Sequence, residues 1–154
     1  MAAAVTVRVQ REDFDIAAEI SSLSRGRSDI GAVVTFSGLC RDEAGTLGAL
    51  ELEHYPGMAE AEIKRICHEA VARFGLQAAT AIHRFGKIRP GENIVLVVTA
   101  SPHRQAAFDG ANLIMDFLKT SAPFWKKEHR IDGSVGEWVS AKDADDTARD
   151  RWTR

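Results

Sequence analysis

The sequence predicts one α+β domain, residues 1–154, with a mainly antiparallel sheet and a long packed helix. Three observations favour this fold class. The chain of 154 residues has the length of one domain, and its composition, 45% hydrophobic and 27% charged, is globular. Strand-like and helix-like segments are interspersed, with short turns between neighbouring strands. The longest apolar stripe at helical spacing lies in residues 103–119.

The first third of the chain predicts a strand, a helix and a second strand. Residues 5–9 alternate Val with Thr and Arg, which is typical of a strand. Asp15 is a suitable N-cap for a helix whose apolar residues recur at helical spacing. Residues 31–40 are rich in β-branched and aromatic side chains and predict a strand. The charged, glycine-containing segment 41–48 follows as a loop.

The middle of the chain predicts a hairpin, a helix and two more strands. Residues 49–55 alternate Leu with Glu, and we expect them to pair with the preceding strand as a hairpin. A helix is predicted over residues 58–74, followed by strands at 78–85 and 94–100. Between these strands, Arg-Pro-Gly-Glu at 89–92 favours a type II turn.

The last third contains the longest predicted helix, residues 103–119, which Pro123 ends. Residues 125–139 resemble a hairpin that turns near Asp132, and a charged tail with helical propensity follows from about 142. The stripe that should face the sheet consists of Ala106, Ala107, Gly110, Leu113, Ile114 and Phe117.

Charge and cysteine content exclude several classes of protein. A net charge of −2 gives no basic face for nucleic acid or a membrane surface. No segment has the length and apolarity of a signal peptide or a membrane span. The distant pair Cys40 and Cys67 fits a reducing compartment, so we expect a soluble, cytoplasmic protein. The alternating pattern around Cys40 favours a buried structural thiol over a nucleophile.

Two lysines are the first candidates for chemistry. Lys119 falls in the last turn of the predicted helix, and Pro123 redirects the chain before Lys126. Two ammonium groups in one partly apolar pocket, walled by Phe124 and Trp125, would repel each other, and both desolvation and like charge lower a lysine pKa. The simpler alternative is that lysines near a helix C-terminus only interact with the helix dipole.

A second candidate site is the strand-to-helix junction at 101–104, where a helix N-terminus, His103 and Arg104 could bind an anion. Its alternative is a solvated junction. Arg41, at a strand end, could bind a phosphate or carboxylate, or pair with its acidic neighbours. The five histidines and two cysteines show no metal-ligand spacing, so no metal site is predicted.

Five segments become recognisable when they are considered together: GAVVTFSGLCR (31–41), LEHYPGMAEAEI (52–63), IHRFGKIRPGE (82–92), SPHRQAAF (101–108) and MDFLKTSAPFWKKE (115–128). In this order they resemble the large subunit of molybdopterin synthase, the MoaE family. The resemblance extends from about residue 5 to 142, and the last segment is especially specific.

This resemblance implies an α/β hammerhead fold and a homodimer of large subunits within a heterotetramer. Each large subunit would bind one small ubiquitin-like (MoaD-like) subunit, whose flexible C-terminal Gly-Gly tail carries a thiocarboxylate. The substrate would be cyclic pyranopterin monophosphate, which receives two sulfurs to form the molybdopterin dithiolene. No metal or redox cofactor is expected, because the sulfur arrives already activated.

The resemblance also implies roles for individual residues. The catalytic lysines of the family fall on Lys119 and Lys126, and Lys142 stands where the family often has an arginine of the neighbouring subunit's pocket. Lysine keeps the charge there but loses the bidentate fork of arginine. The anion-binding and pocket residues fall on Phe36, Arg41, His103, Arg104 and Met115.

Helix length adds a geometric expectation. An unbroken helix from Arg104 to Lys119 separates these residues by roughly 22 Å, too far for one small substrate to contact both. Either the helix breaks, or His103 and Arg104 complete a pocket whose Lys119 belongs to the other subunit; we expect the second.

Two competing functions are a non-catalytic module that binds a ubiquitin-like tail and a partner-free acyl- or phosphoryl-transfer enzyme.

Overall fold

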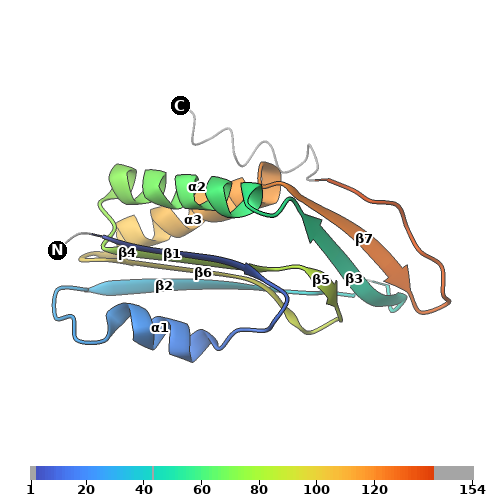
Figure 1. Ribbon diagram of the computed structural model, residues 1–154. Coiled ribbons are helices and arrows are strands. Elements are labelled where there is room, and N and C mark those ends of the chain that lie inside the picture. Colours follow the sequence, from blue (N-terminus) through green and yellow to red (C-terminus); the bar gives the residue numbers. More distant parts are fainter. Residues whose placement is uncertain (1–2, 43, 141–154) are drawn as a thin grey trace.

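The computed structural model describes residues 3–42 and 44–140. Within them, two helices cover one face of a four-stranded sheet, a third helix covers the other face, and a three-stranded sheet lies at one end (Figure 1). The larger sheet has the order β1 (Ala4–Gln10), β4 (Ala78–Arg84), β6 (Asn93–Ser101), β2 (Ala32–Leu39). The smaller sheet has the order β5 (Gly86–Ile88), β3 (Leu47–His54), β7 (Phe124–Arg130). The helices are α1 (Ile16–Ser24), α2 (Met58–Phe74) and α3 (Arg104–Thr120).

The helices begin and end where the sequence predicts, within one or two residues. The Asp15 side chain accepts a hydrogen bond from the Ala18 amide (3.0 Å), which confirms the N-cap of α1. At the start of α2, the Gly57 amide donates to the Glu60 carboxylate (3.1 Å). Gly75, in the left-handed conformation, ends this helix, a conformation that glycine adopts without steric cost.

Both faces of the larger sheet are buried, because successive side chains of a strand point to opposite faces. On one face, Ala79, Ala81, Val95 and Val97 join the main core with α2 and α3. On the other, Ile82, Leu96 and Val98 pack against α1. The residues of α3 that are buried include most of the predicted stripe: Ala107, Gly110, Ala111, Leu113, Ile114, Phe117 and Leu118.

The predicted hairpin between residues 31–40 and 49–55 is wrong. β2 pairs antiparallel with β6, whereas β3 pairs with β5 and β7 in the other sheet. The reason is packing: Leu52 of β3 is buried in a separate small core with Cys40 and Ile88. The connection between β2 and β3 therefore carries the chain from one sheet to the other.

Two further features of the sheets were not predicted. The short strand β5, which supplies Ile88 to the small core, lies between the predicted strand 78–85 and the predicted turn 89–92. β1 pairs parallel to β4, whereas the remaining ladders are antiparallel. The α+β class with mainly antiparallel pairing is confirmed.

The two predicted turns are present. At 89–92, the Glu92 amide donates to the Arg89 carbonyl (3.0 Å) and Gly91 has a φ of 89°, as a type II turn requires. β7 turns back at Asp132, and isolated bridges join Lys126 to Val139 and His129 to Val135. The predicted helical tail from 142 lies outside the described residues. No helix in the described ranges is long and apolar enough to cross a membrane.

Two polar side chains are buried at the end of β4. The Arg84 guanidinium donates to the carbonyls of Arg11 and Asn93 (both 2.9 Å). The His83 Nδ1 lies 2.8 Å from the Arg84 carbonyl. Because burial disfavours the charged imidazolium, the pKa of His83 is lowered from 6.5 to about 4. His83 is therefore neutral near pH 7.

The junction before α3 depends on a glycine. A Cβ at Gly31 would lie 2.0 Å from the Pro102 carbonyl oxygen, a backbone atom that cannot move aside locally. The Gly31 amide also donates to the Ser101 carbonyl (3.1 Å). Gly31 thus allows the start of β2 to pack tightly against the segment that leads into α3.

We expect Gly31→Ala to lower the free energy of unfolding by about 3 kcal/mol, because the added methyl group overlaps backbone. Urea unfolding measures the change. Gly136→Ala is the matched control, since its Cβ would come no closer than 3.4 Å to another atom, a nitrogen of the Arg130 side chain. Equal effects of the two substitutions would contradict the packing argument.

We expect the free energy of unfolding to fall as the pH drops from about 6.5 to about 4. In this window the unfolded chain binds a proton at His83, whereas the folded chain keeps the ring neutral. The contribution of His83 over the whole window is on the order of 3 kcal/mol. Urea unfolding at pH 7 and 4.5 should show a smaller pH effect for His83→Phe than for the unsubstituted protein. An identical pH effect would show that His83 titrates normally when folded.

Candidate functional site

The chain reverses sharply between α3 and β7. The amides of Ser121 and Ala122 both donate to the Phe117 carbonyl (2.8 and 3.2 Å), which tightens the last turn of α3. The Phe124 amide then donates to the Ala122 carbonyl (2.8 Å), so the chain turns around Pro123 directly into β7. This short reversal brings Lys119, in the last turn of the helix, close to Lys126 in the strand.

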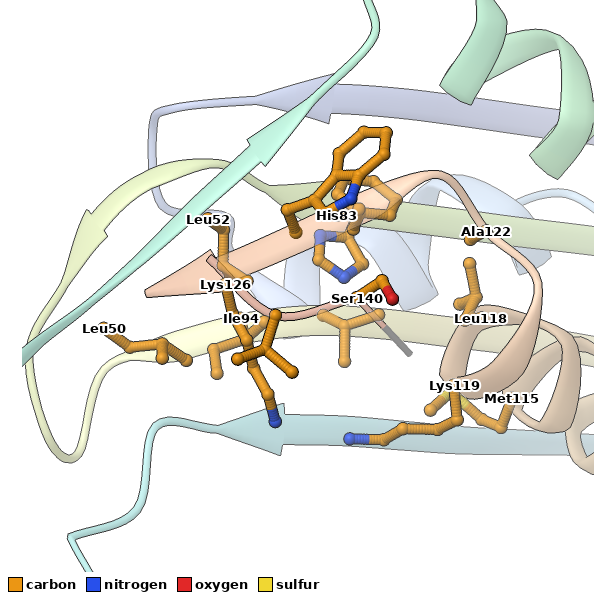
Figure 2. Close-up of a pocket in the computed structure, with 14 residues that line it drawn as sticks. Leu50, Leu52, His83, Ile94, Met115, Leu118, Lys119, Ala122, Lys126 and Ser140 are labelled. Atoms are coloured by element: carbon orange, nitrogen blue, oxygen red, sulfur yellow. The ribbon is translucent and has the colours of Figure 1, made fainter. Parts of the chain in front are cut away.

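Lys119 and Lys126 line one cavity of about 180 Å³, which we name the lysine cavity. In Figure 2 the two side chains enter from different elements and their amino groups point toward one another. The predicted walls Phe124 and Trp125 are also confirmed as lining residues. The remaining lining residues are Leu50, Leu52, His83, Ile94, Val95, Met115, Leu118, Ala122, Val139 and Ser140.

The lysine cavity combines two lysine amino groups with lining residues that are mostly of apolar types. None of its lining residues in the described part of the chain is acidic. The next residue, Lys127, differs from Lys126 because successive strand side chains alternate: its Nζ lies 4.5 Å from the centre of the Trp138 ring. The cavity is therefore suited to bind an anionic group that can also contact apolar walls.

A second cavity, of about 500 Å³, adjoins the first and shares Leu50, Lys126 and Val139 with it. We name it the arginine cavity, because Arg41 lines it. The side chain of Asp42, the acidic neighbour of Arg41, accepts hydrogen bonds from the amides of Gly45, Thr46 and Leu47 (2.9 to 3.2 Å). These bonds fix the conformation of the loop between β2 and β3. The other lining residues are Asp42, Ala44, Thr46, Leu47, Glu128, Arg130, Gly136 and Glu137.

The remaining candidates are divided between the two ends of α3. Met115, one turn before Lys119, lines the lysine cavity. His103 is the N-cap of α3 and Arg104 its first residue, at the opposite end of the helix. Because α3 is unbroken, the predicted possibility of a helix break is wrong.

Phe36, on the edge strand β2, is 40% exposed and lines neither cavity. Lys142 lies outside the described residues.

The sequence did not identify His83 as a cavity residue. The signal was present in the alternation of β4, which directs residues 79, 81 and 83 to the same face of the sheet. This is the face that α2 and α3 cover. Leu50 and Ser140 were also missed. They reach the lysine cavity only because β3 pairs with β7 and because the segment after β7 folds back.

The cysteines and histidines form no further chemical site among the residues that the structure describes. Burial raises the pKa of the Cys40 thiol, and it raises the pKa of Cys67 to about 12. Both thiols are buried and free, which confirms the interpretation of Cys40 as a packing residue. No group of three or more His, Cys, Asp or Glu side chains in the described ranges is arranged to hold a metal ion.

Comparison with known proteins agrees with the geometry. The family model described as "MoaE protein" matches residues 9–121. A molybdopterin synthase catalytic subunit from Rhizobium meliloti is 86% identical over 154 residues, covering 100% of this chain and 99% of the relative.

Two solved structures show the same fold. The molybdopterin biosynthesis MoaE protein from Burkholderia ambifaria superimposes with a TM-score of 0.84 at 42% identity, over 100% of this chain and 99% of that one. A complex of subunits 1 and 2 of molybdopterin-converting factor from Helicobacter pylori, at 19% identity, has a TM-score of 0.69 over 90% of each chain. The chain therefore belongs to the MoaE family of molybdopterin synthase catalytic subunits, which are enzymes of molybdenum cofactor biosynthesis.

Proposed function

We propose that the chain transfers sulfur from the C-terminal thiocarboxylate of a small ubiquitin-like subunit to cyclic pyranopterin monophosphate. The observation that carries this proposal is the meeting of Lys119 and Lys126 in one mainly apolar cavity. Both reactants are anions, and charges in a desolvated site attract each other more strongly than in water. A net charge of −2 makes such a local cationic site necessary.

Lys119 is the proposed catalytic residue and Lys126 its partner. The sulfur of the thiocarboxylate bonds to a carbon of the pterin, the bond from that carbon to its oxygen substituent breaks, and the oxygen leaves with a proton supplied by Lys119. Water then attacks the carbonyl carbon of the resulting acyl–sulfur group. Breaking the acyl–sulfur bond leaves the sulfur on the pterin and a carboxylate on the tail. Lys119 moves protons and stabilises the tetrahedral adduct, while Lys126 stabilises the developing negative charge.

The arginine cavity is the proposed place for the pterin phosphate. Arg41 presents a planar guanidinium that can bind two phosphate oxygens at once. Lys126 lines both cavities, so a substrate bound beside Arg41 extends toward the lysine cavity. Phe36, Met115 and Lys142 stay proposed pocket residues; of these, Met115 lines the lysine cavity.

His103 and Arg104 belong, in our proposal, to the active site of a second copy of the chain. The unbroken α3 separates Arg104 from Lys119 by roughly 22 Å, so one small substrate cannot contact both within one chain. A homodimer in which the start of one α3 approaches the end of the other would complete two equivalent sites. Two small subunits bound to this homodimer make the proposed heterotetramer.

The small subunit is the proposed source of the sulfur. The Helicobacter pylori structure, which has the same fold, is a protein–protein complex of subunits 1 and 2 of molybdopterin-converting factor. A cytoplasmic location belongs to the same proposal, because an activated thiocarboxylate and the free thiols Cys40 and Cys67 suit a reducing compartment. The direct test supplies the pterin precursor and a thiocarboxylated small subunit, with formation of molybdopterin as the measurement.

We expect Lys119→Ala to reduce sulfur transfer by at least a hundredfold, because a proton-transferring group contributes about 10²–10⁴ to a rate. Binding of the small subunit should change little, since only one amino group in the cavity is lost. Lys127→Ala is the matched control, because Lys127 packs on Trp138 instead of lining the lysine cavity. Full activity of Lys119→Ala would refute the catalytic role of Lys119. Binding of the small subunit without any sulfur transfer by the unsubstituted chain would favour the non-catalytic tail-binding module.

We expect a mixture of Lys119→Ala and Arg104→Ala chains to recover activity that neither variant has alone. In a mixed dimer, one of the two sites would contain both an intact Lys119 and an intact Arg104. The measurement is molybdopterin formation after the two variants are unfolded together and refolded. No recovery, with mixed dimers demonstrated by mass spectrometry, would refute the shared site.

A further inference from the structure

His83 lies in the wall of the lysine cavity in a fixed orientation. Only 9% of the residue is exposed, and its ring stacks on Phe124 with 3.9 Å between centroids and 21° between planes. Figure 2 shows its imidazole among the lining residues, in the same view as the two converging lysines. The proposed chemistry assigns no role to this ring, although it is a polar group in the reacting cavity.

The hydrogen bond that His83 makes determines which nitrogen carries its proton. Nδ1 lies 2.8 Å from the Arg84 carbonyl oxygen, and a carbonyl only accepts, so Nδ1 must donate. In a neutral imidazole the other nitrogen, Nε2, then has a free lone pair and is an acceptor. The ring is neutral near pH 7 because burial lowers its pKa to about 4; the hydrogen bond to the Arg84 carbonyl opposes this shift, and the nearby Lys119 and His54 charges add to it.

The acceptor on His83 is distinctive among the side chains of the lysine cavity. Lys119, Lys126 and Trp125 can only donate hydrogen bonds, and Ser140 can donate or accept. Nε2 of His83 can only accept. An extended peptide end carries both an anionic terminus and backbone N–H groups. A buried N–H without an acceptor costs about 1–3 kcal/mol, so a cavity that contained only donors would disfavour the peptide.

We propose that His83 is a positioning residue whose Nε2 accepts a backbone N–H of the peptide end that enters the lysine cavity. The two lysines then bind the anionic terminus, and His83 determines how far the peptide enters and which way its last carbonyl faces. This inference rests on the proposed function, because it requires the sulfur donor to be a peptide terminus. It adds to that function a recognition element for the peptide backbone.

The first test is nitrogen NMR of the full chain labelled with ¹⁵N-histidine. At pH 7 the His83 signals should show a protonated Nδ1 and an unprotonated Nε2. Addition of the small subunit in its carboxylate form should shift the Nε2 signal toward hydrogen-bonded values, and a small subunit that lacks its last two residues should not. A protonated Nε2 in the free chain would overturn the inference.

The outcomes of this titration separate the inference from the function on which it rests. If the complete small subunit binds and Nε2 does not respond, His83 has no role in tail recognition, while the proposed sulfur transfer stands. If the complete and truncated small subunits bind equally well and neither shifts any cavity signal, the tail does not enter the lysine cavity, and both proposals fail.

The second test compares two substitutions that separate the acceptor from the ring. His83→Phe keeps a ring that can stack on Phe124 but has no acceptor, whereas His83→Gln keeps an acceptor and loses the ring. His83→Phe also removes the bond to the Arg84 carbonyl, whereas the amide of His83→Gln has an N–H that can donate to it. We expect His83→Phe to raise KM for the thiocarboxylated small subunit about tenfold, the effect of one lost hydrogen bond, and His83→Gln to raise it less.

A role for His83 in stacking on Phe124 alone predicts the opposite order, in which His83→Phe is nearly normal and His83→Gln is impaired. That order would overturn the inference. Urea unfolding and the circular dichroism of each variant establish that it is folded before its kinetics are compared. If either variant does not fold, the NMR titration of the unsubstituted chain still decides.

Discussion

The site depends on the reversal of the chain between α3 and β7. Three backbone hydrogen bonds around Pro123 end the helix and start the strand within a few residues, so Lys119 and Lys126 project into the same space from rigid elements. β7 is in turn held by its ladder with β3, and the end of α3 is held by the main core through Phe117 and Leu118. The two lysine side chains therefore extend from fixed backbone positions, and no described residue that lines their cavity is acidic.

This arrangement has an electrostatic consequence. Two cations in a mainly apolar cavity disfavour each other, and an anion that enters the cavity removes this repulsion. The packing of the surrounding sheets and helices offsets this repulsion, because it fixes the two backbone segments that carry the lysines. The acceptor of His83 adds the complementary feature, so that the cavity can bind a group with both a negative end and N–H donors. A free peptide terminus has this combination.

Local sequence patterns predict much of the fold, and they also predict the lysine pair of the site. The cap Asp15, the apolar stripe of α3 and the stop at Pro123 are local signals, and they predicted α1 and α3 closely. The lysine pair was predicted for the same reason, because the two residues are only seven positions apart. The pairing of β3 was predicted wrongly, because alternation identifies a strand and its buried face but not its partner.

The family, the helices, most of the strands and the two lysines could be predicted without the structure. Three features became clear from the folded chain alone: β1 runs parallel to β4, β3 joins β5 and β7, and His83 lines the lysine cavity. The folded chain also shows that α3 is unbroken, which separates His103 and Arg104 from Lys119. The physical reason is the range of the interactions involved. Caps, turns and periodicity act over a few neighbouring residues, whereas strand pairing and cavity walls depend on packing between segments far apart in the chain.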